Sequence, residues 1–231
     1  MTRVVRGHAD GIGEDRAVTR ALVGDVAETG EPVVRAWTPH RQVAFGRRDA
    51  RADGYDRARA AAEERGFPSR ERRVGGRAVA YTGRTVAFCR IEPLVDVREG
   101  MTARYEAATA DLRGALADLG APLDRGEPDG AFCPGSHSLS AEGKVVGLAQ
   151  RVRRGAATVA GICLVADRRP IADVLEPVYA ALDVPFERSS IGSVARAGGP
   201  DDPERVARAI ERTLVAGVGG GSGEATVERV S

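Results

Sequence analysis

The chain of 231 residues contains 34 basic residues, and only one of them, Lys144, is a lysine. A lysine ammonium can give up its proton, whereas an arginine guanidinium stays charged in a protein. Cys133 precedes this lysine by eleven residues, and Pro134 and Gly135 follow the cysteine directly. A Pro-Gly pair predicts a turn or loop, where substrate can reach a thiol. Because a thiolate is a strong nucleophile and a nearby cation favours it, Cys133 and Lys144 predict nucleophilic catalysis through sulfur.

A second candidate site is the run that begins at Arg72 and ends at Tyr81, with a glycine pair at its centre. Paired glycines let a backbone come close to a ligand, while amide and guanidinium groups bind carboxylate, phosphate or carbonyl oxygens. The residues of this run that we expect to bind substrate are Arg72, Gly75, Gly76, Arg77, Ala78 and Tyr81.

The segment that starts at Lys144 predicts a strand with small residues on one face. Strict alternation places Lys144 and Gln150 on one face and Gly147 and Ala149 on the other. Because the small side chains leave room beside the backbone, we expect the Gly147 face to be the floor of a ligand site.

Hydrophobic spacing and turn residues predict one domain of mixed secondary structure. The predicted helices cover residues 13–28, 55–65, 102–119, 170–182 and 203–216. The predicted strands cover residues 33–37, 42–46, 77–81, 85–91, 136–140, 144–152 and 156–165, the last three as an antiparallel meander. We expect a catalytic domain over residues 1–216 and a flexible, glycine-rich tail over 217–231.

Composition excludes several classes of partner. The formal net charge is +1 and 4% of the residues are aromatic, which argues against nucleic acid. No apolar run reaches the ~20 residues that span a bilayer, and the N-terminus lacks the apolar core of a secretory signal, so we expect a cytoplasmic protein. Cys89 and Cys163 lie in apolar runs typical of buried strands, and the odd set of cysteines predicts neither disulfides nor a metal site.

Together, the two candidate segments resemble the family of lipoate-protein ligases and lipoyl or octanoyl transferases, which shares its catalytic domain with biotin ligase. The run 143–151, which includes Gln150, is similar to the lysine motif of the family, and 72–81 is similar to its arginine and double-glycine loop. The run 133–135 is similar to the branch that passes acyl chains between lipoyl domains through a cysteine thioester. The resemblance extends to 34–37, 45–47, 178–182 and 192–194.

Three positions depart from the family pattern. Tyr81 stands where a histidine is usual, and Val74 stands where a serine or threonine usually precedes the glycines. Ser138 stands where an aspartate or asparagine is common after the cysteine motif.

The resemblance implies an α+β fold, similar to biotin/lipoate ligases, with a largely antiparallel or mixed sheet flanked by helices. It implies an acyltransferase in which Cys133 carries an octanoyl or lipoyl chain to a lysine of an acceptor protein. Lys144 would support the thiolate and the oxyanion and take the proton of the attacking lysine, with His137 as a rival base. Carriers similar to the glycine cleavage H protein or the E2 subunit of 2-oxoacid dehydrogenases would be the partners, and no cofactor would be needed.

Two other functions stay open at this point. In the first, the chain is an ATP-dependent lipoate-protein ligase with Mg²⁺, in which Lys144 holds a lipoyl-adenylate and Cys133 takes no part. In the second, the chain binds lipoyl carriers without catalysis, as the departures at Val74 and Tyr81 suggest.

Overall fold

The computed structural model of the chain describes residues 1–72, 76–94, 100–218 and 225–230. The helices are α1 (Ile12–Thr29), α2 (Tyr55–Glu63), α3 (Met101–Asp118), α4 (Arg168–Ala181) and α5 (Pro203–Ala216), with short 3₁₀ turns at Asp49–Arg51 and Arg188–Ser190. The strands are β1 (Thr2–Arg6), β2 (Val33–Trp37), β3 (Gln42–Phe45), β4 (Ser69–Glu71), β5 (Val79–Tyr81), β6 (Thr85–Leu94), β7 (Asp124–Arg125), β8 (Ser138–Ser140), β9 (Lys144–Arg153), β10 (Gly155–Leu164) and β11 (Ala225–Arg229).

Within these ranges the strands form a large sheet and a small one. The large sheet has the order β11-β1-β2-β6-β10-β9-β8-β7, and the small sheet has the order β4-β3-β5. In the large sheet β1 runs parallel to both β2 and β11, whereas the other neighbours are antiparallel. The predicted α+β fold with a mixed sheet is therefore confirmed.

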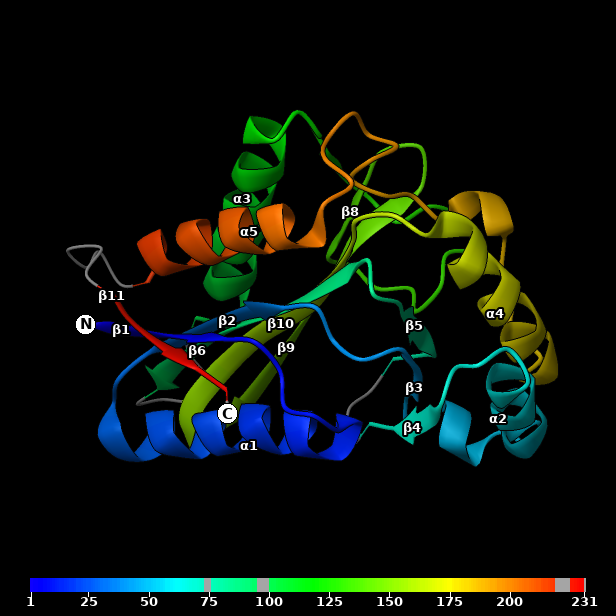
Figure 1. Cartoon of the computed structure of the whole chain (residues 1–231), viewed down its shortest axis with the longest axis horizontal. Coiled ribbons are helices and arrows are strands. Elements are labelled where there is room, and N and C mark those ends of the chain that lie inside the picture. Colours follow the sequence, from blue (N-terminus) through cyan, green and yellow to red (C-terminus); the bar gives the residue numbers. More distant parts are fainter. Residues whose placement is uncertain (73–75, 95–99, 219–224, 231) are drawn as a thin grey trace.

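Helices cover both faces of the large sheet, because its central strands are apolar on both sides. Val34 and Phe88 pack with Leu112 of α3 and Ile210 of α5 on one face. The alternate residues of the same strands, Val33 and Cys89, pack with α1 on the opposite face. Figure 1 shows α3 and α5 above the sheet and α1 below it.

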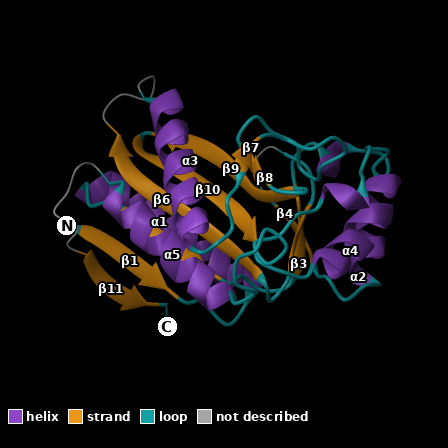
Figure 2. Cartoon of the chain, turned by 90° about the horizontal axis from the view of Figure 1, so that it is seen from above, coloured by secondary structure: helices purple, strands orange, loops and turns teal. Residues whose placement is uncertain are grey.

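The small sheet lies at one end of the large sheet and packs against α2 and α4 (Figure 2). Val43 and Val79 of the small sheet share a core with Val174 of α4 and with Ile162 and Leu164 of β10. One continuous core therefore joins the small sheet to the end of the large one. The loops that contain the candidate site residues converge in this region.

Local signals set the ends of the helices. The Asp202 side chain accepts hydrogen bonds from the amides of Glu204 and Arg205 at 2.9 and 3.3 Å, and Pro203 occupies the first turn of α5. Gly30 ends α1 in a left-handed conformation, with φ of 74°, and its amide donates to the carbonyl of Val26.

The predicted helices and the antiparallel meander are all present, with ends that differ by a few residues. Strands that are consecutive in the sequence nevertheless belong to different sheets, since β2 and β6 lie in the large sheet and β3 and β5 in the small one. Local patterns cannot assign a strand to a sheet. The short strands β1, β4 and β7 were not expected, because few residues carry their pattern.

The expectation of a flexible tail over 217–231 is wrong for residues 225–229. These residues form β11, which pairs with β1. Nη2 of Arg3 in β1 lies 2.8 Å from Oε1 of Glu228 in β11. The reason is that β1, paired on one side with β2, leaves a row of backbone groups without partners on the other side, and residues 225–229 pair with them. Residues 219–224 and 231 lie outside the described residues, and the boundary of the catalytic domain stays a prediction. No helix in the described part of the chain has the length and apolar character to span a bilayer.

Candidate active site

Cys133 lies in the loop between β7 and β8, in a backbone conformation that is unusual for its residue type. Its φ is 41°, in the left-handed region that residues other than glycine seldom adopt. The amide of Cys133 donates to the Tyr179 hydroxyl at 2.6 Å, and that hydroxyl donates to the carbonyl of Ala78 at 2.9 Å. Tyr179 of α4 therefore holds the cysteine loop beside the start of β5.

The sulfur of Cys133 accepts hydrogen bonds from two donors of the arginine and glycine loop. The amide of Arg77 lies 3.3 Å from Sγ, and Nη2 of Arg72 lies 3.7 Å from it. Arg72 also donates to the carbonyl of Arg77. A backbone amide and a guanidinium at a sulfur atom stabilise a thiolate.

The other two cysteines have a different environment. Burial raises the pKa of the Cys89 and Cys163 thiols to about 12, and both residues are fully enclosed in the core. Cys133 is partly exposed. Of the three cysteines, Cys133 is thus the one that a substrate can reach.

Arg72 and Tyr81 form the charged and polar wall beside the sulfur. Burial opposes the charge of Arg72, but the neighbouring Cys133 and Tyr81 outweigh burial and raise the pKa of the guanidinium. Burial raises the pKa of the Tyr81 hydroxyl, although the charge of Arg72 acts in the opposite direction. The Nε atom of Arg72 is buried and has no hydrogen-bond partner among the described residues. A donor of this kind is available for a substrate oxygen.

Gly76 lets the arginine loop come close to the cysteine. Its φ is 89°, and a Cβ atom at this position would lie 2.8 Å from Sγ of Cys133 and 3.4 Å from Nη2 of Arg72. Arg77 is anchored by the buried carboxylate of Asp49, which lies 3.2 Å from Nη1 and accepts the amide of Gly46 at 2.9 Å. Gly75 lies outside the described residues, as does Val74.

Lys144 contacts the main chain of the cysteine loop rather than the sulfur. Its Nζ donates to the carbonyl of Cys133 at 2.8 Å and to that of Phe132 at 3.1 Å. The amine also pairs with both carboxylate oxygens of Glu127, at 2.9 and 3.2 Å, and the lysine side chain is 2% exposed. The cation that touches Sγ is therefore Arg72, whereas Lys144 holds the backbone that carries the sulfur.

Sequence reasoning missed Glu127, which completes this arrangement. Its Oε2 accepts the amide of Gly135 at 3.1 Å and the hydroxyl of Ser138, in addition to Lys144. A carboxylate thus meets Ser138, at the position where the family commonly has an aspartate or asparagine. Glu127 lies in a loop without periodic pattern, so only the three-dimensional fold relates it to Lys144. Tyr179 was missed because a tyrosine on an apolar helix face looks like an ordinary core residue.

A β-bulge corrects the expected faces of β9. The pairing between β8 and β9 shifts after Leu139, so that Ser140 pairs with Lys144 and Leu139 with Val146. The extra residue, Val145, breaks the alternation. A Cβ atom on Gly147 would lie 3.2 Å from Cε of Lys144, so the lysine side chain lies over Gly147 instead of on the opposite face.

The remaining candidates make no hydrogen bond to the sulfur among the described residues. Ala149 is exposed. The backbone amide of Gln150 donates to the hydroxyl of Tyr105 in α3 at 2.7 Å. The ring of His137 stacks on the same tyrosine, with centroids 3.7 Å apart. These contacts place the backbone of Gln150 and the ring of His137 against Tyr105 of α3.

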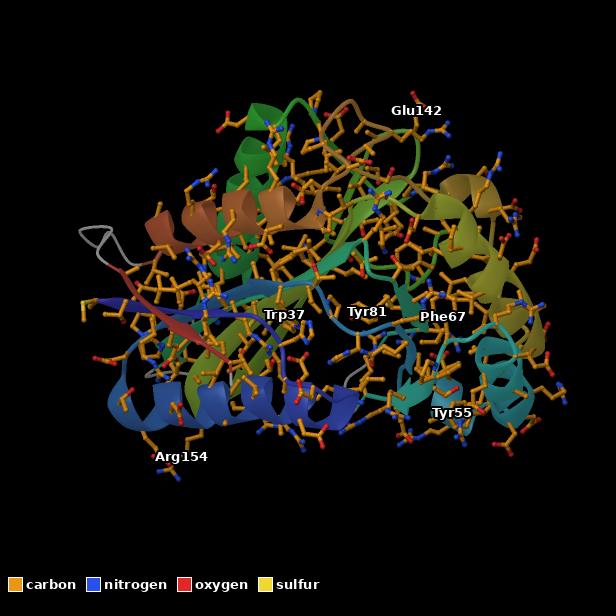
Figure 3. All side chains as sticks on the ribbon, viewed as in Figure 1. Trp37, Tyr55, Phe67, Tyr81, Glu142 and Arg154 are labelled. Carbon is orange, nitrogen blue, oxygen red and sulfur yellow. The ribbon has the colours of Figure 1, made fainter. Side chains whose placement is uncertain are left out.

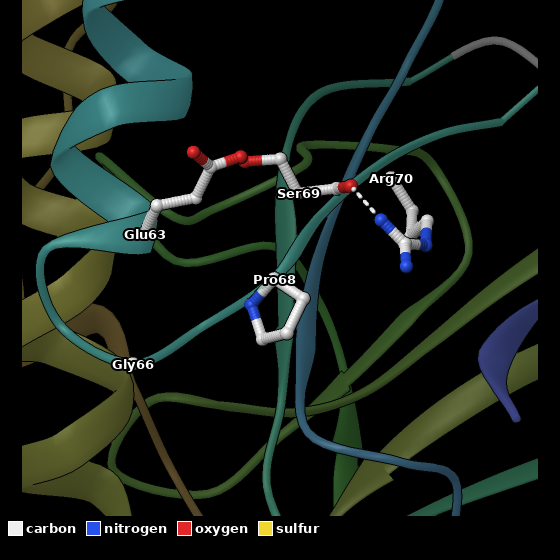
Figure 4. Close-up of a pocket in the computed structure, with 5 residues that line it drawn as sticks. All are labelled: Glu63, Gly66, Pro68, Ser69 and Arg70. Carbon is white, nitrogen blue, oxygen red and sulfur yellow. Dashed lines mark hydrogen bonds between the residues drawn. The ribbon is translucent and has the colours of Figure 1, made fainter.

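Tyr81 lies in the middle of the molecule, whereas Glu142 and Arg154 project from its edges (Figure 3). A separate surface pocket lies beyond the end of α2 and is lined by Glu63, Gly66, Pro68, Ser69 and Arg70 (Figure 4). None of these five residues forms a hydrogen bond or ion pair with Cys133 or Lys144 in the described structure. We therefore place the candidate active site at Cys133 and not at this pocket.

Known proteins are similar to this chain both in sequence and in fold. Residues 13–214 match the family described as the lipoyl protein ligase A/B catalytic domain. The chain is 31% identical over 170 residues to an octanoyl-[GcvH]:protein N-octanoyltransferase of Exiguobacterium sibiricum, an alignment that covers 71% of this chain and 60% of the relative. It is 30% identical over 155 residues to a protein of the same name from Geobacillus kaustophilus, covering 66% of this chain and 55% of the relative.

The chain therefore spans less than two thirds of the length of these curated relatives. Its fold is similar to the crystal structure of a lipoate-protein ligase A bound with ATP, with a TM-score of 0.77 at 18% identity, covering 100% of this chain and 89% of that chain. Because the family match extends over most of the sequence, the chain belongs to the lipoyl protein ligase A/B catalytic-domain family.

Proposed function

We propose that the chain is an acyltransferase that moves an octanoyl or lipoyl chain to a lysine of a lipoyl-domain protein through a thioester on Cys133. The observation that carries this proposal is the environment of Sγ: a partly exposed sulfur that accepts hydrogen bonds from the Arg77 amide and the Arg72 guanidinium. The relatives named as N-octanoyltransferases support the same reaction class.

The reaction has two steps that mirror each other. In the first step, the thiolate attacks the carbonyl carbon of an acylated lysine on a donor carrier. A C–S bond forms, the C–N bond of the amide breaks, and the donor lysine leaves with a proton. In the second step, the neutral amine of the acceptor lysine attacks the thioester carbonyl. A C–N bond forms, the C–S bond breaks, the nitrogen loses a proton to solvent, and the thiolate is regenerated.

Arg72 and the Arg77 amide act where negative charge is present or develops. Before attack they stabilise the thiolate, and after the C–S bond forms they are free to donate to the oxyanion of the tetrahedral intermediate. The Nε donor of Arg72, which has no partner in the described structure, suits the acyl oxygen. Lys144 and Tyr179 position the cysteine by binding its carbonyl and its amide.

We infer that the carriers are similar to the glycine cleavage H protein as donor and to E2 lipoyl domains as acceptor. The name of the relatives, octanoyl-[GcvH]:protein N-octanoyltransferase, supports such a donor. The transfer needs no cofactor, because the overall reaction breaks one lysine amide and forms another, so that no net amide bond has to be made. A cytoplasmic location stays a prediction from the sequence.

Intact-mass measurement after incubation with an octanoylated H protein tests the proposal. We expect the mass of the enzyme to rise by one octanoyl group and hydroxylamine to remove the adduct, as it does with thioesters. Cys133→Ala should lose both the adduct and transfer to an E2 lipoyl domain. Cys163→Ala is the matched control, because it removes a buried thiol and should retain the adduct.

Three outcomes would overturn the proposal. Unchanged transfer by folded Cys133→Ala would exclude the thioester. Release of pyrophosphate from ATP with free lipoate, without an adduct from the carrier, would identify a ligase that uses ATP and Mg²⁺. Retention of a lipoyl domain with neither activity would identify a binding protein.

A further inference from the structure

The Lys144 amine lies next to the residue that would carry the thioester, so an unwanted transfer of the acyl group to this lysine is conceivable on chemical grounds. Nζ donates to the carbonyl of Cys133 itself at 2.8 Å. A neutral amine at this position could attack an acyl group on Sγ of the same residue. The C–N bond would form, the C–S bond would break, the amine would lose a proton to solvent, and the thiol would return. The product, an amide on Lys144, would resist hydroxylamine, which cleaves the thioester.

The contacts of Nζ oppose this reaction. Nζ has the Glu127 carboxylate on one side and the carbonyls of Phe132 and Cys133 on the other. These acceptors use all three donors of an ammonium, and an ammonium has no lone pair with which to attack. A buried ammonium without a carboxylate partner would instead be driven toward the neutral, nucleophilic amine.

We propose that Glu127 keeps the acyl chain on sulfur: it is a positioning residue that holds Lys144 as a paired ammonium on the Cys133 carbonyl and thereby prevents transfer of the acyl group to Lys144. This inference rests on the proposed function. It assigns a role to a residue that belongs to neither candidate motif of the sequence.

The contacts of Glu127 fit this role because the carboxylate binds both sides of the cysteine. Through Lys144 it holds the carbonyls of residues 132 and 133, and directly it accepts the amide of Gly135 and the hydroxyl of Ser138. The ion pair between Lys144 and Glu127 thus binds the backbone on both sides of Cys133, whose own conformation is left-handed. Loss of the carboxylate releases the loop and the amine together.

The contact between Ser138 and Glu127 also predicts a rescue. Since the Ser138 hydroxyl touches Oε2 of Glu127, a carboxylate introduced at position 138 would lie in the same space beside Nζ. We therefore expect Ser138→Asp to replace the missing charge in a Glu127→Gln background. A glutamine has nearly the same shape as the glutamate, so the single variant removes the charge and leaves an acceptor oxygen.

The experiment compares adducts before and after hydroxylamine. Wild-type enzyme incubated with octanoylated H protein should carry only the hydroxylamine-labile adduct. Glu127→Gln should accumulate an octanoyl group that resists hydroxylamine, and peptide mapping should place it on Lys144, the one lysine of the chain. Transfer should decline with each turnover as this adduct grows. The double variant Glu127→Gln/Ser138→Asp should lose the resistant adduct and regain sustained transfer.

Glu142→Gln serves as the matched control, because it makes the same chemical change in an exposed ion pair with Arg196. Such a pair contributes little, and we expect wild-type adducts and transfer. Should Glu127→Gln fail to fold by circular dichroism, Glu127→Asp is measured instead, and we expect the resistant adduct in a smaller share.

The two proposals fail in different ways. If wild-type enzyme forms no labile adduct, the thioester mechanism fails and this inference fails with it. If wild-type enzyme forms the labile adduct but the folded Glu127 variant shows neither a resistant adduct nor declining transfer, only the role of Glu127 is overturned. A resistant adduct that the Ser138→Asp change does not reduce would also contradict the role of the carboxylate.

Discussion

At the scale of single residues, the candidate site depends on the close approach of two loops. Cys133 has a left-handed backbone, which costs about 1–3 kcal/mol in a residue with a Cβ atom and is maintained by hydrogen bonds to its amide and its carbonyl. Gly76 faces the sulfur from the other loop, and its missing side chain leaves the space that Sγ occupies. The sulfur, Arg72 and the Arg77 amide can meet only because residue 76 is a glycine.

Gly76→Ala tests this contact. Because the new Cβ atom would lie 2.8 Å from Sγ, the loops must separate, and we expect transfer to fall about a hundredfold. Transfer to an E2 lipoyl domain and the midpoint of urea unfolding are measured together.

Gly66→Ala is the control for this substitution. Gly66 also has a positive φ, of 73°, but a Cβ atom there would meet no atom within 4 Å. Both variants should lose about 1 kcal/mol or more of stability through backbone strain, while Gly66→Ala should retain transfer. Equal transfer by the two variants would show that the approach of Gly76 to the sulfur has no catalytic importance.

At the scale of secondary structure, elements that are remote in the sequence hold the cysteine loop. Helix α4 supplies Tyr179, whose hydroxyl links the amide of Cys133 to the carbonyl of Ala78 next to β5. Strand β9 supplies Lys144, and the bulge at Val145 turns the lysine side chain toward the cysteine loop. Helix α4 and strand β9 therefore determine the geometry of the loop before β8.

Tyr179→Phe tests the link from α4. The substitution leaves the Cys133 amide and the Ala78 carbonyl without their partner, and an unsatisfied buried group costs about 1–3 kcal/mol. We expect this loss in urea unfolding, together with slower formation of the thioester adduct.

The comparison variant is Tyr55→Phe. Tyr55 packs in the same core, and its hydroxyl has no hydrogen-bond partner among the described residues. It should show wild-type adduct formation, and a Tyr179→Phe variant with wild-type stability and rate would mean that the link is not needed.

At the scale of the whole molecule, one core joins the two sheets. Ile162 and Leu164 at the end of β10 pair with β6 in the large sheet, and their side chains pack with the small sheet and α4. Cys163 lies between them on the face covered by α3 and α5. Because the two sheets share a core, we expect the described fold to unfold as a unit.

Thiol reactivity during unfolding checks this expectation. In the folded protein, iodoacetamide at pH 8 should modify Cys133 only, because the Cys89 and Cys163 thiols are buried, with pKa values raised to about 12. Their modification should rise with urea in the same transition as the fluorescence of Trp37, the one tryptophan. Reaction of Cys163 at a lower urea concentration than the fluorescence change would reveal separate unfolding of the two sheets.

The helices, the meander and the identity of the reactive segments could be predicted, because each depends on a local pattern. Apolar spacing locates α3 and α5, and the Pro-Gly pair after Cys133 marks a loop. Glu127 and Tyr179 could not be predicted in the same way, since neither lies in a motif and both reach the site from distant parts of the chain. The bulge in β9 also has no signal in the residues that form it, which is why simple alternation put Lys144 on the wrong side of Gly147.

The amino-acid sequence alone determined the fold class, the family and the two chemical groups, a loop thiol and a solitary amine, because residue types and short-range spacing record these properties. The tertiary structure decided which cation meets the sulfur. Arg72 donates to Sγ, while Lys144 binds the cysteine backbone and pairs with Glu127. The physical reason is that hydrogen bonds and ion pairs act over a few ångströms, so the role of a charged side chain is set by the neighbours that folding brings to it.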